Sequence, residues 1–153
     1  GVARQEQVDL ADLVKTVCQE QPYPPERLFC EAQSGVRARV DSALITRLLQ
    51  NLIDNGFKYG KPEGHVWVDL GRRDGEIQLT VRDDGIGIPK EQQDKVWQRF
   101  YQVDPSRSER GGAGLGLSMV WKIAQAHGGT MSLESISGLG STFTLHLPEG
   151  ETA

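Results

Sequence analysis

The stretch Asn51-Leu52-Ile53-Asp54-Asn55-Gly56-Phe57-Lys58-Tyr59 lies in a segment whose apolar residues recur with helical spacing. Asp41 can cap this segment, so the sequence predicts a long helix from Asp41 to about Tyr59. With Asn51 at zero on a helical wheel, Asn55 falls at about 40°, Lys58 at about −20° and the apolar residues at about 60° to 200°. The asparagines and the lysine therefore share a stripe along the border of the buried face, where a ligand pocket can form. When this helix is considered alone, a polar flank that meets water is the simpler explanation.

Before this helix, the sequence predicts a shorter helix and two short strands. Asp9 or Asp12 can cap the shorter helix, which continues to about Gln19 and is ended by a group of prolines. The two strand candidates cover residues 27–31 and 36–40.

After the long helix, two hairpins are expected. Residues 65–70 and 76–82 alternate apolar and polar side chains and are joined by a turn at Asp74-Gly75. Residues 130–135 and 141–147 form the second hairpin, which turns at the glycines of residues 138–140.

Two further helices are expected between the hairpins, over residues 90–100 and 115–127, and Gly128-Gly129 ends the second one. Hairpins that alternate with helices predict an α+β fold. In this fold a mostly antiparallel sheet carries helices on one face.

The loop Asp83-Asp84-Gly85-Ile86-Gly87-Ile88-Pro89 follows a predicted strand. Gly85 and Gly87 permit positive φ and a close ligand approach. A carboxylate at the strand end can accept a hydrogen bond from an exocyclic amine such as that of adenine. An acidic turn with a capping aspartate fits the same residues. The loop is not a Rossmann fingerprint, because the glycine spacing differs and Pro89 follows.

A second glycine-rich stretch, Gly112-Ala113-Gly114-Leu115-Gly116-Leu117-Ser118, opens the last predicted helix. Glycines at a helix N-terminus expose backbone N–H groups and the positive end of the dipole, which suits a polyphosphate. A flexible hinge would have the same composition. The stretch is not a P-loop, because no Gly-Lys-Ser/Thr follows the glycines.

The order of these stretches is more specific than any one of them. The stretches 51–59, 83–89, Trp97-Gln98-Arg99-Phe100-Tyr101 and 112–117 resemble the N, G1, F and G2 boxes of sensor histidine kinases. These kinases share a superfamily with gyrase, Hsp90 and MutL. The resemblance implies a two-layer α/β sandwich of the Bergerat type, with a mixed, mostly antiparallel sheet, helices on one face and a flexible ATP lid over about residues 90–113. Residues 1–153 would be a single ATP-binding catalytic domain without a phosphoacceptor domain.

The resemblance also implies ATP and Mg²⁺ as cofactors. Asn55 would be the main Mg²⁺ ligand, Asn51 would support the metal and phosphate region, Lys58 would reach a phosphate, and Tyr59 would pack near the nucleotide. Asp83 would read adenine, with Gly85 and Gly87 giving the base room. The other implied nucleotide contacts are Ile88, Arg99, Phe100, Arg107, Gly112, Gly114, Leu115, Gly116 and Leu117.

Three residues depart from the family pattern. Gly56 stands where alanine is usual, and on the wheel it falls in the apolar face, so we expect it to permit close packing of the helix on the sheet. Trp97 replaces the usual phenylalanine of the F box. Gln102 stands where an arginine is common, so one phosphate contact is expected to be missing.

The residue one helical turn before Asn55 distinguishes a kinase from a hydrolase. In the hydrolytic relatives this residue is a glutamate that activates water, whereas here it is Asn51, which cannot act as a general base. Asp54 points about 100° away from Asn55. The sequence therefore predicts ATP binding with little hydrolysis.

The resemblance implies two partners. The first is the parent's own phosphoacceptor domain, which supplies the histidine that attacks ATP, and the second is the receiver domain of a response regulator.

We interpret the chain's own histidines, His65, His127 and His146, as structural or surface residues. This fragment is therefore expected to bind Mg·ATP without autophosphorylating. The fragment is expected to be a monomeric cytoplasmic domain without direct membrane contact, and its parent a homodimer anchored in the bacterial inner membrane.

Composition excludes several other classes of function. The net charge of −4 argues against a broad nucleic-acid surface. No apolar run approaches the ~20 residues that a membrane-spanning helix needs. Cys18 and Cys30 are expected to be partly buried free thiols, and the three histidines lack the spacing of metal ligands.

Three alternatives stay open in the sequence. A degraded, non-catalytic nucleotide-binding or docking module would keep the same fold. A serine/threonine anti-sigma-type kinase of the same superfamily carries a carboxylate at the position of Asn51, which argues against it. A plain scaffold without a ligand is opposed by the four ordered boxes.

Overall fold

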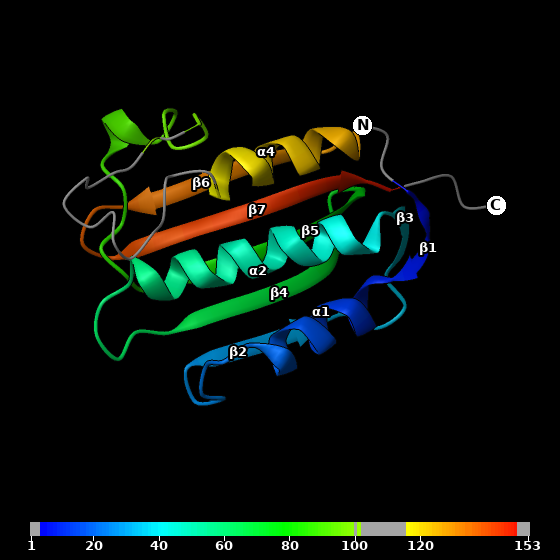
Figure 1. Ribbon diagram of the computed structural model, residues 1–153, viewed down its shortest axis with the longest axis horizontal. Helices are drawn as coiled ribbons and strands as arrows, with labels where there is room; N and C mark the ends of the chain where they lie inside the picture. Colours follow the sequence, from blue (N-terminus) through cyan, green and yellow to red (C-terminus); the bar gives the residue numbers. More distant parts are fainter. Residues whose placement is uncertain (1–3, 100, 102–115, 150–153) are drawn as a thin grey trace.

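The computed structural model describes residues 4–99, 101 and 116–149. Three helices lie side by side on one face of a five-stranded sheet whose order is β2-β4-β5-β7-β6 (Figure 1). The helices are α1 (Leu10–Glu20), α2 (Ser42–Lys58) and α4 (Gly116–Ala126). The strands of this sheet are β2 (Leu28–Ala32), β4 (Val66–Arg73), β5 (Glu76–Asp83), β6 (Thr130–Ile136) and β7 (Gly140–Pro148). This arrangement confirms the predicted two-layer α+β fold.

The sheet is mixed, because β2 pairs parallel to β4 while the other neighbours are antiparallel. The first hairpin turns at Asp74-Gly75 with positive φ at both residues, as the sequence predicts. A separate two-stranded antiparallel sheet is formed by β1 (Glu6–Asp9) and β3 (Arg37–Val40). The strand candidate over residues 36–40 corresponds to β3, and the structure adds its pairing with β1.

Aspartates begin the first two helices. Asp9 caps α1 by accepting a hydrogen bond from the Asp12 backbone N–H at 3.1 Å, and Asp41 caps α2 by accepting one from the Leu44 N–H at 3.1 Å. Asp9 is thus the cap of the two candidates, and the long helix begins where the sequence predicts.

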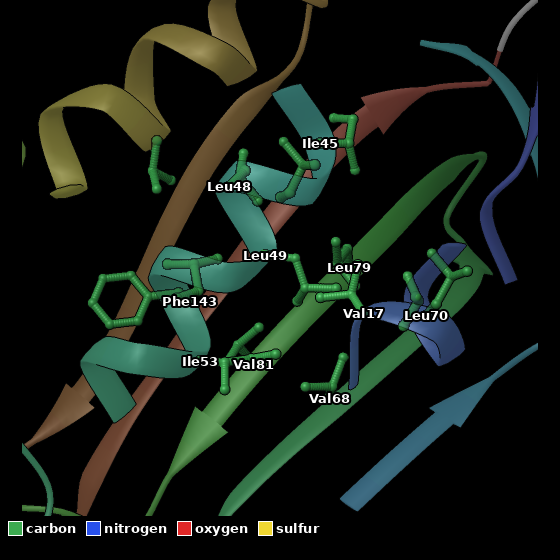
Figure 2. Packing of buried hydrophobic residues seen from close by; sticks show 14 of the residues in the cluster. Val17, Ile45, Leu48, Leu49, Ile53, Val68, Leu70, Leu79, Val81 and Phe143 are labelled. Atoms are coloured by element: carbon green, nitrogen blue, oxygen red, sulfur yellow. The ribbon is translucent and has the colours of Figure 1, made fainter. Parts of the chain in front are cut away.

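The core lies between the helices and the sheet, and Figure 2 shows α2 at its centre. Leu48, Leu49 and Ile53 of α2 are fully buried against Leu79 and Val81 of β5 and their neighbours. Burying such side chains contributes about 1.5–3 kcal/mol each. Packing of this long helix therefore fixes where its polar flank lies.

Gly56 brings α2 close to the sheet. A Cβ atom at Gly56 would lie 2.7 Å from Val66 Cγ2, which is closer than real side chains approach. The expectation that this glycine permits close packing of the helix on the sheet is confirmed.

The helix predicted over residues 90–100 is wrong. The chain forms only a short 3₁₀ helix, η1 (Lys90–Gln92), and then a series of turns up to Arg99. Val96 is buried, and the adjacent Trp97 packs against Trp121 with the two rings tilted and 5.2 Å between their centroids. In a helix, the side chains of two consecutive residues point about 100° apart. Here the side chains of Val96 and Trp97 both pack against the hydrophobic core.

The two cysteines are free and partly buried, as expected. The sequence places them in unrelated segments, but α1 and β2 bring them together. A hydrogen bond between the thiols, together with burial, raises the pKa of Cys18, and the same hydrogen bond lowers the pKa of Cys30.

Candidate functional site

The polar flank of α2 lies where the helical wheel puts it. Asn51 and Asn55 are half-buried and stand one turn apart, while Lys58 is exposed at the last turn. The side-chain NH₂ of Asn51 donates to the carbonyl oxygen of Arg47 at 2.8 Å. This hydrogen bond turns the amide oxygen of Asn51 away from its own helix.

The start of α4 meets this flank. A Cβ atom at Gly116 would lie 3.0 Å from Asn51 Oδ1, so the first residue of α4 packs directly against the asparagine. Helix N-termini carry backbone N–H groups without partners in the helix and a partial positive charge. The amide oxygen of Asn51 and the backbone N–H groups at the start of α4 therefore face one region, which suits a polyphosphate with its cation.

Asp83 ends β5 at the same end of the sheet. Its Oδ1 atom accepts hydrogen bonds from the backbone N–H of Gly85 at 2.9 Å and of Ser141 at 3.3 Å. Burial raises the pKa of Asp83, against the opposing effect of these two hydrogen bonds. The carboxylate is thus held in place by Oδ1, and Oδ2 is the oxygen with which it can accept from a ligand amine.

Two glycines let the loop after Asp83 pack closely. A Cβ atom at Gly85 would lie 2.8 Å from Gly60 Cα, just beyond the end of α2. Gly87 has a φ of 73°, and a Cβ atom there would lie 2.3 Å from the carbonyl oxygen of Ile136. The loop therefore lies between the end of α2 and the turn that joins β6 to β7.

The two adjacent aspartates have different surroundings. Asp84 accepts from the His65 backbone N–H at 2.7 Å, and its Oδ2 lies 2.8 Å from Nδ1 of the same histidine. Burial acts to raise the pKa of Asp84, but these hydrogen bonds outweigh burial and lower it. Asp84 therefore serves to anchor the loop to the start of β4.

Asp54 is occupied on the other side of α2. The Tyr23 hydroxyl donates to Asp54 Oδ1 at 2.8 Å, and the Tyr23 ring stacks on Phe57 with 3.9 Å between centroids. Burial and the hydrogen bond to Asp54 raise the pKa of Tyr23 to about 12. This carboxylate thus points away from the asparagine flank, as the helical wheel predicts.

The remaining predicted contacts lie at the start of the predicted lid and in the G2 box. Trp97 packs on Trp121 of α4 and, edge-on, against Phe143 of β7 at 5.7 Å, while Arg99 is exposed. Leu117 is half-buried in the first turn of α4. Phe100, Gln102, Arg107, Gly112, Gly114 and Leu115 lie outside the described residues.

Residues 40–151 match the family described as "Histidine kinase-, DNA gyrase B-, and HSP90-like ATPase", which is more than half of the chain. The chain belongs to this ATPase family. Its resemblance to the superfamily of gyrase, Hsp90 and the histidine kinases is therefore confirmed, and ATP binding is the property that the family implies.

Relatives of this ATPase domain include the sensor histidine kinase WalK of Bacillus subtilis, which is 43% identical over 115 residues, or 73% of this chain and 19% of WalK. The histidine-protein kinase AfsQ2 of Streptomyces coelicolor is 39% identical over 142 residues, or 93% of this chain and 26% of AfsQ2. The solved structure of the mycobacterial sensor histidine kinase MprB matches with a TM-score of 0.80 at 26% identity and covers 94% of this chain and 97% of that one. The chain spans less than a third of the length of both curated relatives.

Within the ATPase domain, sequence reasoning missed the contribution of the last hairpin. Ser135 and Ser141 contact the loop after Asp83 through hydrogen bonds of 2.7 Å to Ile88 N–H and 3.3 Å to Asp83. This contact follows from the pairing of β7 with β5. The sequence alone does not give the order of the strands, so it could not predict the contact. The roles assigned to the predicted site residues stay predictions.

None of the helices in the described part of the chain is long and apolar enough to cross a membrane.

Proposed function

We propose that residues 1–153 are the ATP-binding catalytic domain of a bacterial sensor histidine kinase. The observation that carries the proposal is the meeting of three features at one end of the sheet. These are the asparagine flank of α2, the first residue of α4 and the Asp83 carboxylate. Mg·ATP requires a carboxylate that binds adenine, oxygen ligands for Mg²⁺ and N–H groups for the triphosphate.

Asp83 reads the base in this proposal. Its Oδ2 accepts a hydrogen bond from the exocyclic amine of adenine, while Oδ1 is held by Gly85 and Ser141. Guanine presents a carbonyl oxygen at the matching position, which a carboxylate repels. The site therefore favours ATP over GTP.

The phosphates and Mg²⁺ lie between α2 and α4. Asn55 supplies an amide oxygen, the kind of hard ligand that Mg²⁺ accepts, and the oxygen of Asn51 faces the same region, so the donor set fits the ion. When bound, Mg²⁺ neutralises phosphate charge. Lys58 adds a positive charge, and the start of α4 adds backbone N–H groups.

The reaction is transfer to a histidine and not to water. The position one turn before Asn55 is an amide, and Asp54 is held by Tyr23, so neither side chain acts as a general base for hydrolysis. In the intact parent, an imidazole nitrogen of the phosphoacceptor domain forms a bond to the γ-phosphorus as the bond to the ADP oxygen breaks. Alignment and charge stabilisation supply the catalysis.

The partners follow from this reaction. The phosphoryl group passes from the histidine to an aspartate of a response regulator. The parent is proposed to be a membrane-anchored homodimer with this domain in the cytoplasm.

Calorimetric titration with a non-hydrolysable ATP analogue, with and without Mg²⁺, tests the proposal. We expect one-to-one binding in the micromolar range, or about −7 to −8 kcal/mol, that depends on Mg²⁺. Asn55→Ala removes the Mg²⁺ dependence, whereas Gln50→Ala in the same helix does not. Failure to bind at millimolar analogue would favour the non-catalytic module, and rapid ATP hydrolysis by the unaltered chain would contradict transfer to a histidine.

A further inference from the structure

Gln93 joins two segments that frame the Asp83 loop. It is half-buried and follows η1, at the point where the chain leaves that loop. Its side-chain Nε2 donates to the carbonyl oxygen of Ile88 at 3.0 Å and to the carbonyl oxygen of Ser135 at 3.1 Å. Both hydrogens of one amide group are thus used, one on the loop and one on β6.

Ser135 holds the same loop residue from the other side. Its Oγ accepts from the Ile88 backbone N–H at 2.7 Å, so the N–H and the carbonyl of Ile88 are both engaged. The hydroxyl hydrogen of Ser135 is directed at Gly140 O at 3.0 Å. The hydrogen in the 2.9 Å contact between the two serine hydroxyls therefore comes from Ser141.

Ser141 completes the connection to Asp83. Its side chain is buried, and its backbone N–H donates to Asp83 Oδ1. Hydrogen bonds to the backbone and side-chain groups of Ser135 and Ser141 therefore link Gln93 to the carboxylate. Such a network is rigid only while each member keeps its partner.

We propose that Gln93 is a positioning residue of the adenine site, acting through Ile88 and Ser135 on the loop that carries Asp83. The inference rests on the proposed function, because it assumes that adenine binds at Asp83. Gln93 itself touches no nucleotide in this proposal. It fixes the distance between the loop and β6, and so the place where the base lies.

The substitution Gln93→Glu tests this role with little change in shape. It replaces a donor of two hydrogen bonds by a carboxylate that faces two carbonyl oxygens, which repel it. The matched control is Gln92→Glu, which adds the same charge one residue away. Gln92 uses its Oε1 to accept from the Tyr101 hydroxyl, and a carboxylate keeps that hydrogen bond.

The probe is adenosine, which lacks phosphates and reports on the base site alone, and binding is followed by NMR titration. We expect Gln93→Glu to weaken adenosine binding about tenfold and Gln92→Glu to change it less than about twofold. Lowering the pH from about 7.5 to 5 should restore part of the affinity of Gln93→Glu relative to the unaltered chain, because a protonated glutamic acid again donates one hydrogen bond. A residue that only stabilises the fold would lower the unfolding midpoint without this selective change in affinity.

Exchange of the Ile88 backbone amide gives a second readout that needs no nucleotide. We expect faster exchange in Gln93→Glu and Ser135→Ala than in Gln92→Glu, and recovery in Ser135→Thr, which keeps the hydroxyl. Adenosine binding unchanged by Gln93→Glu would overturn the positioning role and leave the proposed function standing. An unaltered chain that binds neither adenosine nor the ATP analogue would overturn the proposed function and the positioning role together.

Discussion

Asp83 serves two opposed demands. Burial raises the pKa of its carboxyl, which means that the charged form costs folding free energy. The same charged form is the acceptor that adenine needs. We therefore expect Asp83→Asn to raise the free energy of unfolding at neutral pH, because asparagine keeps an oxygen for Gly85 and Ser141 without a buried charge. Denaturant unfolding of the two proteins measures this gain.

The same substitution should weaken nucleotide binding by roughly 1.5–3 kcal/mol, because an amide NH₂ would face the adenine amine. The stability advantage of Asp83→Asn should grow as the pH rises from the ordinary aspartate value of 3.8 through the raised pKa of the folded protein, and it should vanish below 3.8. A variant that gains stability and keeps its affinity would show that Asp83 does not contact the base.

Single residues explain how far the sequence could go. Asp83, Gly85 and Gly87 could be found because a carboxylate at a strand end and glycines in a following loop have a chemical meaning that does not depend on strand order. Ser135 and Gln93 could not be found, because their side chains hydrogen-bond to backbone N–H and C=O groups, which nearly every residue carries, so no pattern in the sequence marks these partners. The helical wheel alone correctly predicts that Asp54 points away from Asn55. It does not predict that Tyr23 is the hydrogen-bond partner of Asp54.

The contact between α2 and β4 depends on the missing side chain of Gly56. Alanine there gains about 1 kcal/mol of helix propensity, but its Cβ would lie 2.7 Å from Val66 Cγ2 in a fully buried site. Overpacking of this kind costs about 1–3 kcal/mol. We expect Gly56→Ala to lower the free energy of unfolding by about 1 kcal/mol, measured by urea denaturation.

A double-mutant cycle with Val66→Ala separates the two contributions. Val66→Ala alone should destabilise the protein, and the double variant should be more stable than the sum of the single effects predicts, because the small side chain accepts the new methyl group. Additive effects would show that α2 moves away from β4 freely.

The start of α2 is joined to the end of α4 by His127. Its Nδ1–H donates to Ile123 O at 2.8 Å, and its Nε2 accepts from the Asp41 backbone N–H at 3.0 Å. The ring is buried, so His127→Ala leaves a backbone N–H without its partner and should cost about 1–3 kcal/mol of unfolding free energy. Gln125→Ala, at an exposed position of the same helix, is the control and should change stability by less than about 0.5 kcal/mol. Equal effects of the two substitutions would contradict this role.

The incorrect helix over residues 90–100 shows why this element could not be predicted. Its spacing of polar and apolar residues fits a helix, but isolated helices shorter than ~12 residues are marginal and depend on packing. Here Trp97 finds its partners in Trp121 and Phe143, which are distant in sequence. The long helix had enough buried residues of its own to be predicted correctly.

The molecule as a whole should lose stability in acid. Hydrogen bonds from the Leu44 and Arg4 backbone N–H groups lower the pKa of Asp41, and the His146 side chain lowers that of Glu76. Asp84 also has a lowered pKa, because hydrogen bonds from His65 outweigh burial. Such groups contribute stability above their ordinary values of 3.8 and 4.5, and this stability is lost as the pH falls through the lowered values.

We expect the urea midpoint to fall steadily between about pH 5 and pH 2. Asp83 acts in the opposite direction but is a single group. Glu76→Gln should flatten the dependence, since it removes one of the contributing carboxyl groups. A midpoint that rises on acidification would mean that the raised pKa of Asp83 outweighs the other three.

The order of strands has a consequence for how the chain is made. Thr80 of β5 contacts Thr144 of β7 at a separation of 64 residues. Strand β2 pairs with β4 although β3 and α2 lie between them in the sequence. Long-range pairing of this kind is slow, because loop-closure entropy is lost before contacts form. While the ribosome is still adding the last hairpin, β5 has an open edge, and the apolar side chains of α4 lack the two strands on which they pack. Until β7 emerges, the nascent domain is therefore a substrate for chaperones and a candidate for aggregation.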